Sequence, residues 1–188
     1  MILGYTIIEP DEGQNMFDNL KLDECAKYSN IYDLNIIDPN FKVKRKKYNI
    51  SSTYDGFTIV SEKFKQFCAS EKYPGLVFIS LPKAQGFYWF KVNNLLEYDT
   101  KRRETQFLNY NLVCKGYEEI IGADPVCLKN KVILPDGFFR TDVCFGSHSG
   151  KSPLYLVGDV TKKKLINAGF NEIFYKKILD KYDWEKIN

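Results

Sequence analysis

The sequence predicts an α+β fold with a mixed or mostly antiparallel sheet and short helices. Short apolar runs of the kind that form strands outnumber the amphipathic stripes that form helices. The helical segments are only about ten residues long. A unit of strand, polar cap, short helix, glycine and strand occurs twice, and we treat it as a candidate structural repeat. The 188 residues fit one domain over 1–188, because no flexible tract divides them.

The composition excludes several classes of protein. Aromatic residues make up 15% of the chain and hydrophobic residues 44%, which excludes disorder over most of its length. The net charge of +3 is too close to zero to demand a nucleic-acid partner. No apolar run approaches the roughly 20 residues that span a bilayer, and residues 1–8 lack the cationic leader of a signal peptide. We therefore expect a cytoplasmic protein with no membrane segment.

Five cysteines are widely spaced in the chain, at positions 25, 68, 114, 127 and 144. Their number is odd, and a chain of this size needs no disulfides, so we expect free thiols in a reducing cytosol. A zinc site could be drawn from Cys114, Cys127, Cys144 and His148. However, these residues lack the paired Cys-x₂₋₄-Cys spacing of structural zinc sites. Small buried cysteines are the favoured interpretation, and we predict no metal or other cofactor.

The first third of the chain gives mixed signals. Residues 2–8 predict a strand that ends at the turn residues 10–13. Residues 14–29 are ambiguous, with apolar positions that indicate a short helix. A short apolar run at 34–37 precedes another turn. Residues 41–48 predict a half-exposed edge strand, because apolar and cationic side chains alternate at its start.

The first strand–helix–strand unit follows. Residues 56–60 predict a strand, and Ser61 is the expected helix cap. Helical spacing aligns three apolar side chains on one face, namely Phe64, Phe67 and Cys68. Pro74 and Gly75 end the helix before a buried strand over 76–81.

The second unit lies near the carboxyl end. Residues 154–158 predict a strand, Asp159 is the expected cap, and a helix runs from Val160 to Ala168. Gly169 ends that helix, and residues 170–175 predict a strand.

Further strands are expected between the two units, at 86–92, 95–99, 107–114, 132–134 and 138–143. The Asp136–Gly137 pair between the last two is typical of a turn. Residues 178–188 are expected to form a closing helix with Trp184 against the body.

Catalysis through histidine has one candidate. His148 lies in the small-residue turn 146–151, near Cys144 and Ser147. A nucleophile and its base must lie within hydrogen-bond reach, and adjacent loop residues rarely provide this. An exposed loop histidine is the favoured interpretation, and a small cytosolic enzyme (hydrolase or transferase) with a site near Cys144 and His148 is the alternative.

Two other clusters invite a binding role. Five of the six residues 42–47 are cations beside Tyr48, which could contact phosphates and stack on a base. Because no nucleic-acid module is visible, a solvated edge or a patch for an acidic protein partner is favoured over nucleic-acid binding.

The aromatic strand and the Phe-Arg strand supply the predicted partner-binding residues. Tyr88 and Phe90 share one face of a strand, and Arg140 and Asp142 share one face of another. If those faces are open, they present rings and charges to a partner. The alternatives are an aromatic strand covered on both faces and a structural Arg–Asp pair.

The order of several segments is also informative. These segments are Thr58–Phe64, Pro74–Phe78, Tyr88–Phe90, Leu96–Asp99, Gly137–Arg140 and Gly169–Phe174. Over about residues 56–178 the chain resembles the Imm43-type immunity proteins of bacterial polymorphic toxin systems. The resemblance implies a cytosolic α+β protein that sequesters a partner toxin, with no catalytic residue.

We therefore expect a non-catalytic binding protein that neutralises a toxin by covering its active cleft. Such a contact buries about 800 Å² on each partner and depends on aromatic and charged anchor residues. The sequence does not define the oligomeric state.

Overall fold

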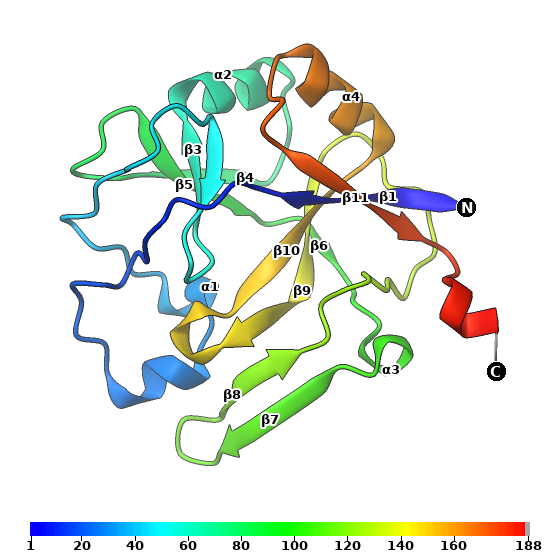
Figure 1. The fold of residues 1–188 in the computed structure, drawn as a ribbon, viewed down its shortest axis with the longest axis horizontal. Coiled ribbons are helices and arrows are strands. Elements are labelled where there is room, and N and C mark those ends of the chain that lie inside the picture. The colour runs from blue at the N-terminus through cyan, green and yellow to red at the C-terminus, as the bar shows by residue number, and fades with distance from the viewer. Residues whose placement is uncertain (187–188) are drawn as a thin grey trace.

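A computed structural model describes residues 1–186 and arranges their strands in two sheets (Figure 1). The strands are β1 (Ile2–Ile8), β2 (Ile50–Ser52), β3 (Thr58–Ser61), β4 (Leu76–Ser80), β5 (Phe87–Val92), β6 (Leu95–Leu96), β7 (Gln106–Asn111), β8 (Gly116–Ile121), β9 (Phe138–Ser147), β10 (Ser152–Val157) and β11 (Phe174–Leu179). The α-helices are α1 (Ile31–Leu34), α2 (Glu62–Ser70), α3 (Thr100–Arg103) and α4 (Asp159–Asn167). Short 3₁₀ turns are η1 (Glu24–Tyr28), η2 (His148–Gly150) and η3 (Asp183–Lys186).

Antiparallel pairing dominates both sheets. The larger sheet has the order β11-β1-β10-β9-β8-β7, with β6 beside β9, and the smaller has the order β2-β3-β5-β4. Among these strands only β6 and β9 pair in parallel. The predicted α+β class with a mostly antiparallel sheet is confirmed.

The candidate repeat has the same arrangement in both places. In the first unit, β3 and β4 flank β5, and α2 connects them. In the second, β10 and β11 flank β1, and α4 connects them. Each pair of flanking strands runs antiparallel to the strand between them. The central strand of the first unit, β5, follows that unit directly in the sequence, whereas the central strand of the second, β1, comes from the amino end of the chain. The terminal ammonium group lies 2.5 Å from Asp180, just after β11.

The two unit helices begin differently. The Ser61 hydroxyl accepts a hydrogen bond from the Phe64 N–H at 3.3 Å, so the predicted cap of α2 is correct. Asp159, however, is the first residue of α4, and Gly158 is its cap. A Cβ atom at position 158 would lie 2.3 Å from the Leu134 carbonyl oxygen, so only glycine fits there.

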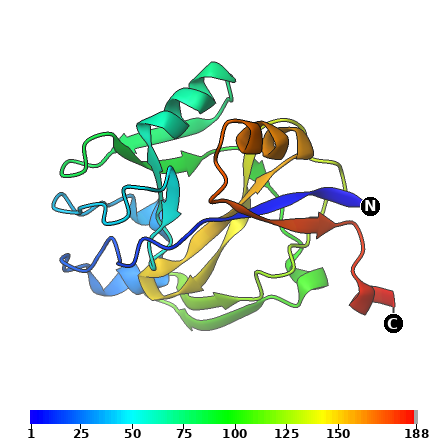
Figure 2. The same ribbon diagram turned by 45° about the horizontal axis from the view of Figure 1, so that its top comes forward.

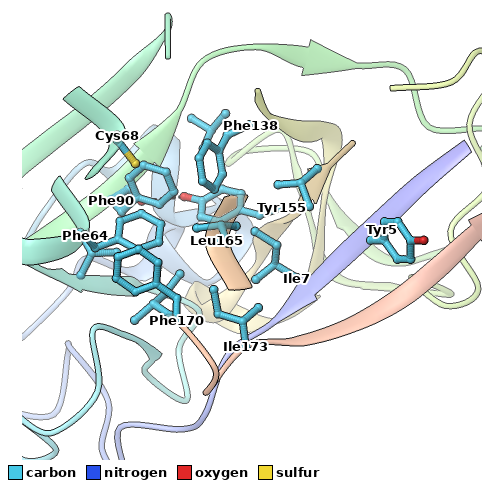
Figure 3. Close-up of a cluster of buried hydrophobic side chains, with 14 residues drawn as sticks. Tyr5, Ile7, Phe64, Cys68, Phe90, Phe138, Tyr155, Leu165, Phe170 and Ile173 are labelled. Atoms are coloured by element: carbon cyan, nitrogen blue, oxygen red, sulfur yellow. Dashed lines mark hydrogen bonds between the residues drawn. The ribbon is translucent and has the colours of Figure 1, made fainter. Parts of the chain in front are cut away.

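A central cluster of buried side chains joins the two units (Figure 3). Phe64 of α2 lies at its middle, with ring centroids 5.5 Å from Phe90, 5.8 Å from Phe138 and 5.2 Å from Phe170. Edge-to-face contacts of this kind add to the burial of apolar area. The smaller sheet, the larger sheet and both helices therefore share one core.

The unit helices α2 and α4 and the β7–β8 hairpin lie at opposite sides of the molecule. Figure 2 shows α2 and α4 along one side, while β7 and β8 lie on the other side next to η1. The hairpin forms the end of the larger sheet, because within residues 1–186 the sole strand partner of β7 is β8. In the described part of the chain, no helix has both the length and the apolar character needed to cross a bilayer.

The predicted edge strand over 41–48 is wrong. This segment is a loop, although Phe41 and Val43 are buried and Lys42 and Lys44 between them are exposed. The buried carboxylate of Glu12 holds it by accepting hydrogen bonds from the N–H groups of residues 44 and 45. The backbone donors therefore bind a side chain rather than a neighbouring strand.

Three boundaries near the carboxyl end also differ from expectation. Residues 132–134 are not a strand; the residue 134 N–H donates to the Leu3 carbonyl, and the Leu134 side chain is buried against β1. The predicted strand over 170–175 begins only at Phe174, because Phe170 turns into the core. The predicted closing helix over 178–188 is the end of β11 and the short turn η3, with residues 187–188 outside the described part.

Candidate protein-binding site at a hairpin tip

The aromatic strand β5 is covered on both faces. Phe90 is 0% exposed in the central cluster, so its predicted role in binding a partner is wrong. Tyr88 is half-buried against α2, where its hydroxyl donates to Glu62 and Lys65 lies 4.1 Å from its ring centre. The helix α2 covers this face, which the strand's own sequence cannot reveal.

Arg140 and Asp142 do not form an ion pair with each other in the described structure. The Arg140 Nε donates to the Val92 carbonyl at 2.8 Å, and its guanidinium lies 4.3 Å from the ring centre of Tyr32. The exposed Asp142 accepts the N–H of Tyr98 at 2.8 Å. Arg140 thus joins the two sheets, and Asp142 holds the loop after β6 against β9.

Cys144 and His148 have different environments. Cys144 is buried, and burial raises the pKa of its thiol to about 12, so the nucleophilic thiolate is disfavoured. His148 is exposed, and its Nδ1 lies 3.1 Å from Glu118. No hydrogen bond joins the two side chains within residues 1–186, so the geometry of a nucleophile and its base is not formed.

The expectation of five free thiols is wrong for two of them. Cys25 of η1 and Cys114 form a disulfide, whereas Cys68, Cys127 and Cys144 are free and buried. The pair is 89 residues apart in sequence, so only the tertiary fold could reveal it. Because Cys114 is bonded, its sulfur cannot serve as a ligand of the candidate zinc site. Among the described residues no three metal-binding side chains converge.

The disulfide lies in a broad open groove of about 640 Å³. One wall is formed by residues 22–28, and the other by Asn111 at the end of β7 and by Val113 and Cys114 after it; Ser149 also lines the groove. We call it the tip groove. The Asp23 carboxylate caps η1 by accepting the N–H groups of residues 25 and 26, and this orders the first wall.

The opposite wall ends in exposed apolar side chains. Residues 112–115, which we call the hairpin tip, connect β7 to β8. The Asn111 carboxamide oxygen accepts the N–H groups of residues 113 and 114, which fixes the turn. Leu112 is 83% exposed and Val113 is 87% exposed. Beside these two aliphatic side chains, the groove is rimmed by Asp23, Glu24 and Lys27. This arrangement resembles a protein interface, which has an apolar centre and a polar rim.

A buried lysine holds the middle of β8. The Lys151 Nζ donates to the carbonyl oxygens of Lys27 at 2.7 Å, of Glu118 at 3.2 Å and of His148. It therefore connects η1, β8 and η2 at one point. Burial lowers its pKa to about 8, while three carbonyl acceptors favour the ammonium form, which has three N–H donors.

A second, smaller site lies between the two sheets. A cavity of about 150 Å³ contains the carboxyl of Glu9 and the hydroxyls of Thr58 and Ser152. The Thr58 hydroxyl donates to Glu9 at 3.3 Å, and burial raises the pKa of that carboxyl to about 7. The sequence did not single out Glu9, because its neighbours in space come from three different strands.

The hairpin tip was also missed, although one signal for it was present. The predicted strand over 107–114 continues through the apolar pair Leu112–Val113. Asn111 before that pair and Gly116 after it are typical turn residues, and they mark 112–115 as a loop.

Comparison of the chain with known proteins found no match among protein-family models, curated proteins or solved structures.

Proposed function

We propose that this chain is a non-catalytic binding protein that covers a protein partner with its hairpin tip and tip groove. The observation that carries the proposal is the exposure of Leu112 and Val113, 83% and 87%, beside an open groove. Burying such side chains in a partner contributes about 1.5–3 kcal/mol each. The groove is broad and open, a shape suited to a protein surface rather than to a small substrate.

The resemblance noted in the sequence indicates the kind of partner. An immunity protein of a polymorphic toxin system works by occlusion, and a preformed surface is what occlusion requires. The proposed partner is therefore a toxin domain, and the proposed location is the cytoplasm, where such a toxin would act. The oxidation state of the Cys25–Cys114 pair then matters, because thiol reductants act in that compartment.

The test uses the toxin domain encoded by the neighbouring reading frame. A Leu112→Asp/Val113→Asp variant is expected to bind this domain at least about 30-fold more weakly in calorimetry, because charges would be buried at the centre of the interface. Val160→Asp is the matched control: Val160 is 51% exposed and lies on α4, away from the hairpin. Equal losses in both variants, or no loss in either, would contradict the proposed surface.

An enzyme is the second candidate, and Glu9 is the observation that favours it. A carboxyl with its pKa raised to about 7 in a polar cavity has the properties of a general acid or base. The cavity of about 150 Å³ has room for about five waters at their liquid volume. Hydrolysis of any small substrate that Glu9→Gln abolishes, with the fold intact by circular dichroism, would favour this candidate.

A further inference from the structure

The Cys25–Cys114 disulfide is the covalent link between the two walls of the tip groove. Cys25 belongs to η1, and Cys114 belongs to the hairpin tip. We propose that this bond is a redox-controlled clip: the oxidised protein holds the groove in its preformed shape, and reduction releases the hairpin tip from η1. The effect on partner binding depends on the proposed function, whereas the opening of the groove does not.

The hairpin tip has few other connections to the body. Leu112 and Val113 are almost fully exposed, and the hydrogen bonds of Asn111 stay within the hairpin itself. None of the six residues of β7 is buried. The disulfide is therefore the main restraint on residues 112–115, and a segment with so few buried contacts opens locally at low free-energy cost.

The part of β8 next to the tip has independent anchors. A Cβ atom at Gly116 would lie 2.2 Å from the Tyr28 carbonyl oxygen, which shows how closely β8 packs on η1. Two residues further, the Glu118 carbonyl accepts a hydrogen bond from Lys151. These contacts do not involve sulfur and persist after reduction. Opening is thus confined to the tip, with a hinge at the start of β8.

The position of the disulfide makes it accessible to a reductant. Both of its cysteines are half-buried and line the open groove. A dithiol reductant attacks one sulfur through its thiolate and forms a mixed disulfide as the Cys25–Cys114 bond breaks. Its second thiol then displaces the protein sulfur. Two electrons and two protons pass to the protein, which gains two thiols, and the reductant becomes a disulfide.

Such a clip would connect binding to the redox state of the compartment. Disulfides in cytosolic proteins are usually transient and sense redox state. A groove that is already ordered binds without the entropy cost of fixing a mobile wall. The oxidised form is therefore the stronger binder, and reduction weakens binding by freeing one wall.

The first experiment counts thiols and maps amide exchange in the full chain. Under oxidising conditions we expect three thiols per denatured chain, and five after treatment with dithiothreitol, in line with one disulfide and three free cysteines. Reduction should speed deuterium uptake of residues 111–115 by about tenfold or more. Uptake in β8 and β11 should stay unchanged. Five thiols before reduction, or equal uptake at the tip in both states, would overturn the clip.

A Cys25→Ser/Cys114→Ser variant supplies the matched control. It should show fast deuterium uptake at residues 111–115 with and without dithiothreitol. Any change that dithiothreitol causes in this variant is therefore unrelated to the disulfide. If the variant folds poorly, the reduced wild type reports the deuterium uptake of the open tip in its place. Reduction is then expected to weaken binding of the toxin domain by about tenfold or more. If reduction opens the tip but neither the oxidised nor the reduced protein binds the toxin domain, the proposed function alone is refuted. If reduction opens the tip but leaves the affinity for the toxin domain unchanged, the redox control of binding is refuted.

Discussion

Replacing Lys151 with methionine removes the charged group that connects η1, β8 and η2. The lysine is 2% exposed, and burial lowers its pKa from the ordinary 10.5 to about 8. Between these two pH values the unfolded chain binds more protons than the folded chain. The free energy of unfolding of the wild type therefore rises as pH increases through this range.

The size of the effect follows from the two pKa values. The difference between 10.5 and about 8, at 1.36 kcal/mol per pH unit, amounts to about 3 kcal/mol. Other groups oppose this trend, because the buried tyrosines and thiols have raised pKa values and destabilise the fold when they must ionise. The effect of Lys151 must therefore be measured as a difference between two proteins.

The assay is urea unfolding followed by circular dichroism between pH 7 and pH 10. The free energy of unfolding of the wild type minus that of Lys151→Met should increase by about 2.5 kcal/mol over this range, which ends just below the unfolded pKa. The exposed Lys101→Met serves as the control and should give a flat difference. A flat or falling difference for Lys151→Met would refute the interpretation that burial outweighs the three carbonyl acceptors and lowers the pKa of this ammonium group.

Three further predictions concern the core, a helix start and the small cavity. Phe64→Ala should lower the free energy of unfolding by about 3–5 kcal/mol, because it empties the middle of the central cluster. Its control, Tyr54→Ala at a 66% exposed position, should change that free energy by less than about 0.5 kcal/mol. Equal effects of the two substitutions in chemical denaturation would contradict the assigned core. Gly158→Ala should cost about 1–3 kcal/mol, because its methyl group meets the Leu134 carbonyl, and a neutral melting temperature would contradict that contact. Because the pKa of Glu9 is raised to about 7, the free energy of unfolding of the wild type should fall by about 2–3 kcal/mol between pH 4.5 and pH 7 relative to that of Glu9→Gln. A difference between the two proteins that does not change with pH would contradict the raised pKa of this carboxyl.

The strand–helix–strand units could be predicted because short-range signals define them. Ser61 caps α2, and the apolar stripe of that helix faces the core as its spacing requires. The other errors come from partners distant in sequence and, for β8, from an interrupted apolar pattern. Residues 41–48 alternate like a strand, but their donors bind the Glu12 carboxylate, so no ladder forms. The strand β8 was missed because its two central glutamates interrupt the apolar pattern.

The candidate site was harder to predict than the fold. Alternation placed Tyr88 and Phe90 on one face correctly, but whether that face is open depends on where α2 packs. Similarly, Cys25 and Cys114 meet only because Lys151 and Gly116 bring the hairpin onto η1. Exposure and pairing of this kind are properties of the folded molecule and are not written in any local window of the sequence.

A hydrogen-exchange footprint of the complex tests the central proposal most directly. The oxidised protein would be mixed with the toxin domain encoded by the neighbouring reading frame, and amide uptake compared with that of the free protein. We expect slower uptake in residues 22–28 and 111–115, which form the walls of the tip groove, and unchanged uptake in α2 and α4. Protection confined to other surfaces, or no protection at saturating toxin, would contradict binding through the hairpin tip.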